Sequence, residues 1–322
     1  MKRLIVSMLL TVLLLSGCQT SPQSYSETQF LLDTVCTIQA GGPDAKAAVQ
    51  AAFSRIREVS DAVDFYSDTS TVAAFNRAGA GEAVPLDTHT AAVLDTALAV
   101  SRASGGAFDV TIAPVQALWP FHGEENPAPP AQEEIAARLP LVGYDKLDFD
   151  PAASTLSKTR AGVEIDLSGA AKGYAGDQAV QALREAGAVY ALLDLGGNVM
   201  VLGKNPSRPD GNWQVGIQTP FALGGTYDRT LSVSQGAVVT SGTYQRGFDF
   251  EDRHYHHILD PATGYPADSG LSGVTITAES GLLADCLSTA CLVLGEEKGR
   301  ALAEQFGAGI YLNNETTKEN QQ

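Results

Sequence analysis

Apolar residues recur at helical spacing along several stretches of this chain, which predicts amphipathic helices. The clearest stretch is 45–63, where apolar side chains stand three or four residues apart and Asp44 precedes them as a candidate N-cap. A second stretch, 89–103, ends just before Gly105 and Gly106, and glycine commonly terminates helices. The same spacing predicts further helices over 131–139, 170–186, 281–294 and 296–306.

Short runs of β-branched and apolar residues between these stretches predict strands. The expected strands are 30–38, 163–167, 190–194, 199–202, 213–218, 230–234, 238–241 and 274–277. Gly196-Gly197-Asn198 lies between two of them and indicates a hairpin turn. Because the predicted helices gather early and late around antiparallel hairpins, the pattern favours an α+β fold over a regular series of βαβ units. No linker or repeat divides the chain after residue 28, so we expect one domain over 29–314 and a polar tail over 315–322.

Residues 1–17 have the features of a secretory signal. A short basic start precedes an apolar run from Leu4 to Leu15. This run is shorter than the ~20 residues that a membrane-spanning helix needs, and it suits the apolar part of a signal peptide. It ends in Leu15-Ser16-Gly17-Cys18, which resembles the lipobox of bacterial lipoproteins and predicts lipidation of Cys18; an ordinary cleaved signal peptide is the alternative. We expect residues 18–28 to form a polar tether.

Composition and charge narrow the classes of function. The chain has 322 residues, with 37 acids against 21 bases and a formal net charge of −16. Nucleic-acid binders depend on basic patches that displace counterions, so this balance argues against that class. It also argues against docking on anionic lipid through protein charges. Cys36, Cys286 and Cys291 show no zinc-binding spacing, and we expect them to be buried as small apolar residues.

The segment from Asp166 to Tyr174 is suited to anion binding, because a predicted strand there meets a predicted helix across small residues. The free N–H groups and the positive dipole end of such a helix attract an anion, and Lys172 adds a charge in its first turn. The spacing matches neither the Walker A loop nor the GxGxxG pattern. A phosphate site and a tight strand–helix junction with a surface lysine are both compatible with these residues.

Candidate metal ligands stand in two further segments. In an extended backbone His254 and His256 would share one face and could bind a metal together, although no third ligand is evident; a hairpin rim with a hydrogen-bonded histidine is the alternative. Asp285, Ser288 and Thr289 would share one face of a helix, and their oxygen atoms suit Mg²⁺ rather than zinc. Hydroxyls that bond back to the preceding turn would explain the same residues structurally.

The segment from Gly105 to Pro114 combines glycines with Phe108 and Asp109. Glycine lets a planar ligand approach the backbone, and an aromatic side chain can pack on such a ligand. A helix C-cap followed by a strand explains this segment equally well.

Together these segments resemble the ApbE family, the FAD:protein FMN transferases, over about residues 29–312. The matching segments are, in chain order, Leu32-Asp33-Thr34; Tyr66, Ser70 and Asn76; Gly106 to Asp109 with Thr111 and Pro114; Asp166 to Ala175 with Asp177; Gly196 to Asn198; Thr240 to Arg246; His256 to Pro266; and Ala284 to Thr289. Asp33 and Thr243 depart from the family pattern, in which glycine and aspartate are usual. Each motif alone has modest specificity, but all of them in the same order are not expected by chance.

The resemblance implies an ApbE-like, T-fold-related fold of antiparallel sheets flanked by helices. It implies Mg²⁺-dependent cleavage of FAD, transfer of FMN to a Ser or Thr hydroxyl of a target flavoprotein, and release of AMP. The metal ligands would be Asp285, Thr289 and the backbone carbonyl of Gly169, with Ser288 at a position that is an acid in some relatives. The residues expected to contact FAD are Leu32, Tyr66, Ala107, Phe108, Asp109, Asp166, Lys172 and Leu259.

His257 is our candidate for the base that takes the proton from the target hydroxyl, because an unperturbed imidazole titrates near pH ~6.5. The resemblance also implies a lipid-anchored protein of the bacterial periplasm or cell surface, whose targets are membrane redox subunits or periplasmic flavoproteins. Two alternatives remain: an FAD pyrophosphatase that yields FMN and AMP, and an FAD-binding lipoprotein without turnover.

Overall fold

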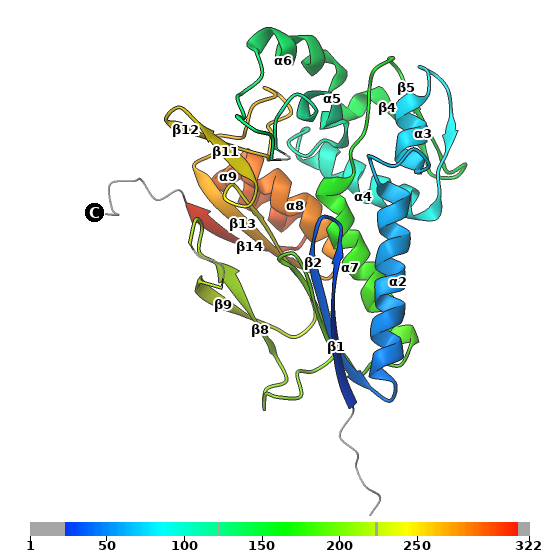
Figure 1. Cartoon of the computed structure of the whole chain (residues 1–322), viewed down its shortest axis with the longest axis vertical. Helices are drawn as coiled ribbons and strands as arrows, with labels where there is room; N and C mark the ends of the chain where they lie inside the picture. The colour runs from blue at the N-terminus through cyan, green and yellow to red at the C-terminus, as the bar shows by residue number, and fades with distance from the viewer. Residues whose placement is uncertain (1–22, 122, 223–224, 315–322) are drawn as a thin grey trace, which may run out of the picture.

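The computed structural model describes residues 23–121, 123–222 and 225–314. Its largest sheet contains the strands β1 (Gln23–Leu31), β2 (Thr34–Gly42), β6 (Tyr190–Leu195), β7 (Asn198–Leu202), β10 (Gly236–Gly242), β13 (Leu271–Ala278) and β14 (Gly309–Asn314), neighbours in that order. Every neighbouring pair in this sheet is antiparallel. Helices lie against the sheet (Figure 1), which confirms the predicted α+β fold class.

Three long helices form the layer that covers one face of this sheet. They are α2 (Ala45–Val63), α7 (Ser168–Glu185) and α8 (Gly281–Leu294); α2 packs on α7, and α7 packs on α8. Their apolar faces meet sheet residues such as Ile38, Leu193 and Val239, all fully buried. The remaining helices are α3 (Thr71–Arg77), α4 (Thr88–Ala103), α5 (Ala113–Gln116), α6 (Gln132–Arg138) and α9 (Glu296–Gln305). All six predicted helices are confirmed, with ends within two residues of those expected.

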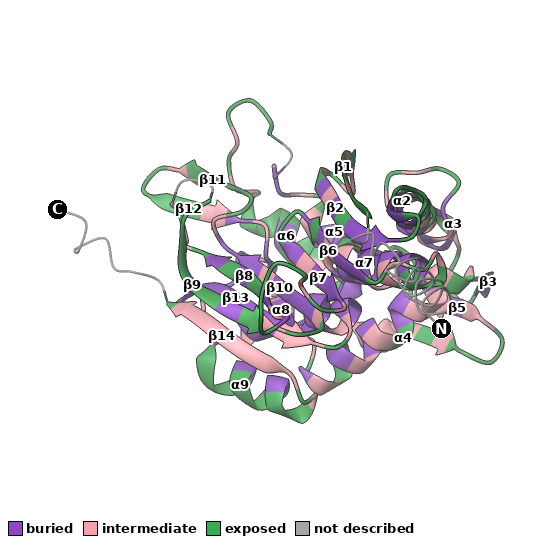
Figure 2. Cartoon of the chain, turned by 90° about the horizontal axis from the view of Figure 1, so that it is seen from below, coloured by how far each residue is buried: buried purple, intermediate pink, exposed green. Residues whose placement is uncertain are grey.

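Smaller sheets surround this core. The hairpin of β8 (Trp213–Gln218) and β9 (Tyr227–Val233) has an apolar face, with Val215, Ile217 and Leu231 packed against Val238 of β10. A second hairpin joins β11 (Gly247–Phe250) to β12 (Arg253–His256). The third small sheet has the order β3 (Val84–Pro85), β5 (Thr155–Lys158), β4 (Leu147–Asp150). Figure 2 shows that the buried residues concentrate between the main sheet and its helices.

The N-terminal hairpin corrects two predictions. Residues 30–38, expected as one strand, are interrupted by a turn at Leu32 and Asp33, so that β1 and β2 pair directly across it. The tether expected over 18–28 ends by Gln23, where β1 begins. Both turn residues have positive φ, 54° and 55°, the conformation of a turn that usually selects Asn or Gly. Asp33 tolerates this conformation, but Leu32 does not favour it and no glycine or asparagine is present, so the sequence signals the turn only weakly.

Residues 163–167, also expected as a strand, are not part of any sheet. Asn76 takes the place of a strand partner, because its side chain donates to the carbonyl of Ile165 at 3.0 Å and accepts from the N–H of Ile165 at 2.8 Å. The buried Lys158 ammonium donates to the carbonyl of Val163 at 2.8 Å and to two carbonyls at the end of α3 at 3.0 Å. These bonds hold the segment that leads into α7 against α3.

Contacts between α7 and α8 fix the register of the two helices. A Cβ atom at Gly173 would lie 2.6 Å from the carbonyl carbon of Gly281 and 2.8 Å from Cβ of Asp285, so only glycine fits between the helices. One turn later, the Asp177 carboxylate accepts hydrogen bonds of 2.7–3.1 Å from two N–H groups and a hydroxyl at the N-terminus of α8. Lys172 on α7 and Asp285 on α8 are therefore held at a fixed separation.

The remaining predictions concern cysteines and the chain ends. Cys36, Cys286 and Cys291 are free and buried, as predicted. Among the described residues, none of the helices has the length and apolar character needed to cross a membrane. The predicted signal peptide over 1–17, the lipidation site Cys18 and the polar tail over 315–322 lie outside the described residues.

Candidate active site

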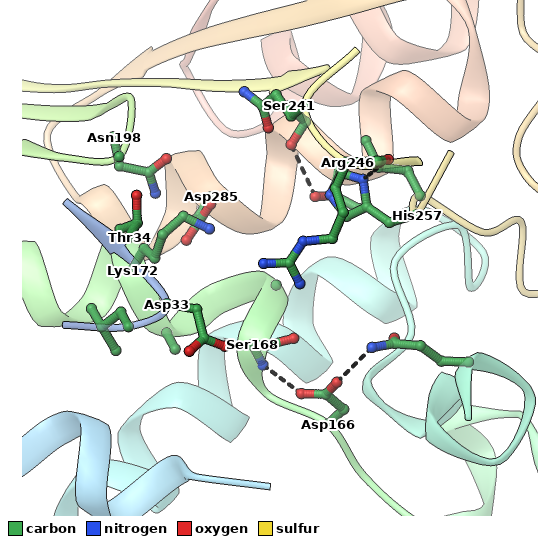
Figure 3. A pocket seen from close by; sticks show the side chains of 18 of the residues that line it. Asp33, Thr34, Asp166, Ser168, Lys172, Asn198, Ser241, Arg246, His257 and Asp285 are labelled. Carbon is green, nitrogen blue, oxygen red and sulfur yellow. Dashed lines mark hydrogen bonds between the residues drawn. The ribbon is translucent and has the colours of Figure 1, made fainter. Parts of the chain in front are cut away.

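A pocket of about 1020 Å³ opens at the end of the main sheet, where two hairpin turns meet the start of α7 (Figure 3). The β1–β2 turn contributes Leu32 and Asp33, and the β6–β7 turn contributes Gly196 and Gly197. The candidate residues that line the pocket are Leu32, Tyr66, Ala107, Phe108, Asp109, Asp166, Gly169, Lys172, His257, Leu259, Asp285 and Thr289. The fold thus brings all the residues expected to contact FAD, the candidate base and three of the four proposed magnesium ligands to one cavity, whereas Ser288, His254 and His256 do not line it.

Positive charge enters the pocket from Lys172 on α7 and from Arg246, just before β11. Neither side chain forms a hydrogen bond or an ion pair within the described part of the chain. Asp166 holds the start of α7, since its carboxylate accepts from the N–H of Ser168 at 2.8 Å and from the Gln116 amide at 2.9 Å. Two cations without partners beside a helix N-terminus are suited to bind phosphate groups.

Asp285 and Thr289 present oxygen atoms from one face of α8. Asp285 is only 4% exposed, and its carboxylate accepts a hydrogen bond of 2.8 Å from the N–H of Gly173. Burial raises the pKa of Asp285, while the Lys172 charge and the Gly173 N–H act in the opposite direction. In the described ranges, no three His, Cys, Asp or Glu residues are arranged so that they could hold a metal ion by themselves. The Asp285 carboxylate and the Thr289 hydroxyl are nevertheless oxygen ligands of the kind that a hard cation prefers.

Ser288 lies on α8 next to Thr289 but does not line the pocket. It is fully buried, its hydroxyl donates to the backbone carbonyl of Asp285 at 2.9 Å, and it shares a hydrogen bond of 2.7 Å with the Ser241 hydroxyl. The bond to the preceding turn matches the structural alternative considered for this residue. Ser288 therefore lies behind the oxygen atoms that Asp285 and Thr289 present to the pocket.

His257 is oriented by the backbone of Arg246. Both its N–H and its ring Nδ1 donate to the Arg246 carbonyl, each at 3.1 Å. With the proton on Nδ1, the lone pair of the neutral ring is on Nε2. Burial lowers the pKa of His257 to about 4, with smaller contributions in the same direction from the charges of Lys172 and Arg246. A neutral imidazole whose Nε2 is unbonded among the described residues is able to accept a proton, and its lowered pKa makes it a weaker base than the unperturbed histidine expected from the sequence.

The other two histidines of this segment bond elsewhere. His256 donates from Nε2 to the carbonyl of Ala267 at 3.0 Å and accepts at Nδ1 from the N–H of Ile258 at 3.3 Å. The ring nitrogens of His254 lie 2.7 Å from Asp249 and 3.1 Å from the carbonyl of Thr243. These bonds use both nitrogens of each ring, so the structure favours the hairpin interpretation over a shared metal.

Apolar and aromatic residues form another part of the pocket lining. Phe108 is buried next to Gly169, and Leu259 is buried as well, whereas Tyr66 is 69% exposed. Leu32 adds an aliphatic side chain from the β1–β2 turn. Such side chains can pack against a planar, partly apolar ligand.

Asp109 lines the pocket but uses its carboxylate internally. It accepts from the N–H of Thr111 at 2.9 Å, from the Thr111 hydroxyl at 2.6 Å and from the N–H of Tyr144 at 2.7 Å. Burial raises its pKa, and these hydrogen bonds lower it. Its carboxylate therefore stabilises the backbone next to Phe108 through its bonds to Thr111 and Tyr144.

The pocket residues that were not expected from the sequence as site residues include Gln116, Asn198 and Arg246. Asn198 is 2% exposed, its side chain faces Asp285 in Figure 3, and its amide acts to lower the pKa of the Asp285 carboxyl. The motifs Gly196 to Asn198 and Thr240 to Arg246 were the available signals for two of them. Gln116 carried no signal, because its role depends on a contact with Asp166, distant in sequence.

The chain is similar to curated enzymes and to solved structures. An FAD:protein FMN transferase of Treponema pallidum is 31% identical over 305 residues, covering 90% of this chain and 84% of that protein. Its counterpart in Haemophilus influenzae is 32% identical over 263 residues, covering 80% and 75%. The crystal structure of an ApbE protein from Thermotoga maritima superposes with a TM-score of 0.81 at 33% identity, covering 90% of this chain and 94% of that one.

A flavin transferase ApbE from Vibrio cholerae superposes with a TM-score of 0.78 at 28% identity, covering 92% of this chain and 94% of the other. The sequence profile described as "ApbE family" matches residues 32–312, which include every pocket residue discussed above. The match spans far more than half of the described fold, and the chain belongs to the ApbE family.

Proposed function

We propose that this chain is a Mg²⁺-dependent FAD:protein FMN transferase, which cleaves FAD, transfers FMN to a Ser or Thr hydroxyl of a target flavoprotein and releases AMP. The observation that carries the proposal is that one pocket brings together the neutral His257, two cations without a partner in the described ranges, and the oxygen atoms of Asp285 and Thr289. The relatives named FAD:protein FMN transferase support the same reaction.

The proposed orientation of FAD follows from the separation of charged and apolar residues in the pocket lining. The pyrophosphate lies at the N-terminus of α7, where Lys172 and Arg246 supply positive charge. The flavin ring packs on the surfaces of Phe108, Tyr66 and Leu259. The remaining proposed contacts come from Leu32, Ala107, Asp109 and Asp166.

The residues present fit a magnesium ion. Asp285, Thr289 and the carbonyl of Gly169 are all oxygen donors, and Mg²⁺ sites commonly combine one or two carboxylates with substrate phosphates and water. The Asn198 amide beside Asp285 acts to lower the pKa of that carboxyl, which favours the charged form that a cation needs. When bound, Mg²⁺ supplies charge neutralisation on the pyrophosphate oxygens. Ser288 supports this arrangement through its bonds to Ser241 and to the Asp285 backbone.

Residues of this chain accept the proton of the acceptor hydroxyl and orient the phosphates. The acceptor oxygen forms a bond to the phosphorus of the FMN half, the bond from that phosphorus to the AMP oxygen breaks, and the acceptor proton passes to Nε2 of His257. The Arg246 carbonyl keeps the ring of His257 in place by holding Nδ1. Lys172 and the helix N-terminus stabilise negative charge on the phosphate groups.

Location and partners belong to the same proposal. The lipobox-like segment supports lipidation at Cys18 and attachment to a membrane on the periplasmic or outer side of a bacterial cell. The acceptors are then membrane redox subunits or periplasmic flavoproteins, which share that compartment. Globomycin, which blocks removal of lipoprotein signal peptides, should cause the unprocessed chain to accumulate; unchanged processing would contradict the anchor.

Mass spectrometry tests the activity. A candidate flavoprotein incubated with this chain, FAD and Mg²⁺ should gain the mass of FMN on a Ser or Thr, and AMP should appear in equal amount. His257→Asn should abolish the mass gain while FAD binding persists. AMP release without a modified acceptor would identify a pyrophosphatase, and FAD binding without AMP release would identify a flavin-binding protein without turnover.

A further inference from the structure

Two exposed apolar side chains lie beside the β1–β2 turn that lines the pocket. Among the described residues, the large apolar side chains with the greatest exposure are Phe30, Val35, Tyr66, Val189, Phe221 and Tyr227. Phe30 and Val35 are direct cross-strand partners in β1 and β2, next to the Leu32-Asp33 turn that lines the pocket. They are 70% and 58% exposed. We call these two residues the hairpin patch.

The face of the sheet that carries the hairpin patch leads to the pocket. Side chains two residues apart along a strand share a face, so the next pair on this face is Thr28 and Thr37, whose hydroxyls lie 3.0 Å apart. Thr37 is in register with Asp194 of β6, and Asp194 lines the pocket. The α2 helix contacts the opposite face, where alternate β1 residues are half-buried. The hairpin patch is therefore continuous with the pocket wall on the solvent side of the sheet.

The proposed reaction requires the acceptor protein to lie close to the hairpin patch. FAD occupies the pocket, and the acceptor hydroxyl has to reach His257 inside it, so the acceptor protein has to lie across the mouth. Exposed apolar side chains grouped beside a functional cavity are typical of a protein interface, and aromatic residues contribute strongly to such interfaces. The two residue pairs of the hairpin nearest the turn carry Phe30, Val35 and two threonines on this face, an apolar and hydroxyl-bearing surface that Asp194 borders on the pocket side.

We propose that the hairpin patch is a docking surface for the acceptor protein, and that the acceptor presents an apolar side chain beside the Ser or Thr that receives FMN. This inference rests on the proposed transferase function. It separates two binding steps: FAD binds through residues inside the pocket, and the acceptor is held through Phe30 and Val35 outside it.

The test uses the full chain in detergent with Phe30→Ser and Val35→Thr combined, and a flavoprotein that the wild-type chain flavinylates. Both residues are exposed, so the fold does not depend on them. The KM for the acceptor should rise at least ~10-fold, with kcat and FAD affinity unchanged. Val189→Thr combined with Tyr227→Ser removes apolar residues of similar exposure, 60% and 61%, that do not line the pocket, and should leave every constant unchanged.

A second measurement examines the acceptor side. A peptide that spans the modified Ser or Thr should lose reactivity with the wild-type chain when its apolar neighbours are changed to Ser, and this loss should be smaller with the hairpin-patch variant.

Four results would overturn the proposal: an unchanged acceptor KM, an equal loss of FAD affinity, a wild-type dimer that dissociates in the variant, or a loss of binding to phosphatidylglycerol vesicles. The last two would assign the patch to a second copy of the chain or to lipid. If the wild-type chain modifies no acceptor at all, the transferase proposal fails and this inference fails with it; if only the KM effect is absent, the transferase proposal stands.

Discussion

Replacement of Gly173 by alanine tests whether the close approach of α7 and α8 assembles the site. The new Cβ would lie 2.6 Å from the Gly281 carbonyl carbon and 2.8 Å from Cβ of Asp285, and it would be nearer still to the Gly281 carbonyl oxygen. Carbon atoms prefer separations of roughly 3.5–4.0 Å, so the helices must move apart by about 1 Å. Backbone atoms cause this clash, and no side-chain rotation relieves it.

The expected change in the free energy of unfolding combines two opposing contributions. Overpacking costs about 3 kcal/mol, and the better helix propensity of alanine returns about 1 kcal/mol. A net loss of about 2 kcal/mol lowers the Tm by roughly 4–8 °C for a domain of this size. A displacement of about 1 Å between Lys172 and Asp285 should lower the transfer rate by a further ~100-fold.

Gly176→Ala is the matched control on the same helix. Its Cβ would meet the end of the Met200 side chain, which is flexible and able to move aside. This variant gains the same helix propensity and should stay within about 1 kcal/mol of wild type, with nearly normal transfer. Thermal unfolding and FMN transfer are measured for both variants. Equal stability and activity of the two would refute the idea that the Gly173 contact sets the geometry of the site.

Two further predictions concern stability. Burial lowers the pKa of His256 to about 4, below the ~6.5 of an unfolded histidine, so its contribution is complete above pH ~6.5 and declines as the pH falls toward about 4. Between pH 7 and pH 5 the wild type should lose about 2 kcal/mol more unfolding free energy than His256→Gln in urea titrations, and equal losses would contradict this origin. Lys158→Met leaves three buried carbonyl oxygens without their donor and should lower the unfolding free energy by about 3 kcal/mol. Lys298→Met, at an exposed position of α9, should change it by less than ~0.5 kcal/mol, and an equally mild effect at Lys158 would show that the three bonds contribute little.

The helices could be predicted from the sequence because their apolar spacing is a local property. The segment over 163–167 has the composition of a strand, but its partner is the Asn76 side chain, which no local pattern reveals. The turn at Leu32 and Asp33 contains no glycine or asparagine although both residues have positive φ, so residue preference signals it only weakly. Local sequence therefore predicts periodic elements better than it predicts backbone that side chains from elsewhere fix in place.

The site residues could be named from motifs, but their roles depend on direction and distance. Ser288 and Thr289 are neighbours on α8, and the sequence places both on the face of Asp285. One helical step is about 100°, which is enough to turn Ser288 toward Ser241 while Thr289 lines the pocket. Arg246 acts on His257 through its backbone carbonyl as well as through its charge. Since every residue has a backbone carbonyl, the sequence does not show which one makes such a contact.

The charge of the pocket leads to a final prediction about the metal. The acidic side chains lining it are Asp33, Asp64, Asp109, Asp166, Asp194 and Asp285, against Lys172 and Arg246 as the cationic ones. A pyrophosphate adds two more negative charges, so the cations of the chain do not balance them. One added charge pair at about 5 Å is worth about 3 kcal/mol at an effective dielectric of about 20, which corresponds to roughly 100-fold in affinity. Chelation with EDTA should therefore weaken FAD binding by about that factor in equilibrium titrations of flavin fluorescence. Riboflavin has no phosphate, and its affinity should not change. If EDTA leaves FAD affinity unaltered, the α7 N-terminus, Lys172 and Arg246 are sufficient for the phosphates, and the buried Asp285 carboxylate has a role other than metal binding.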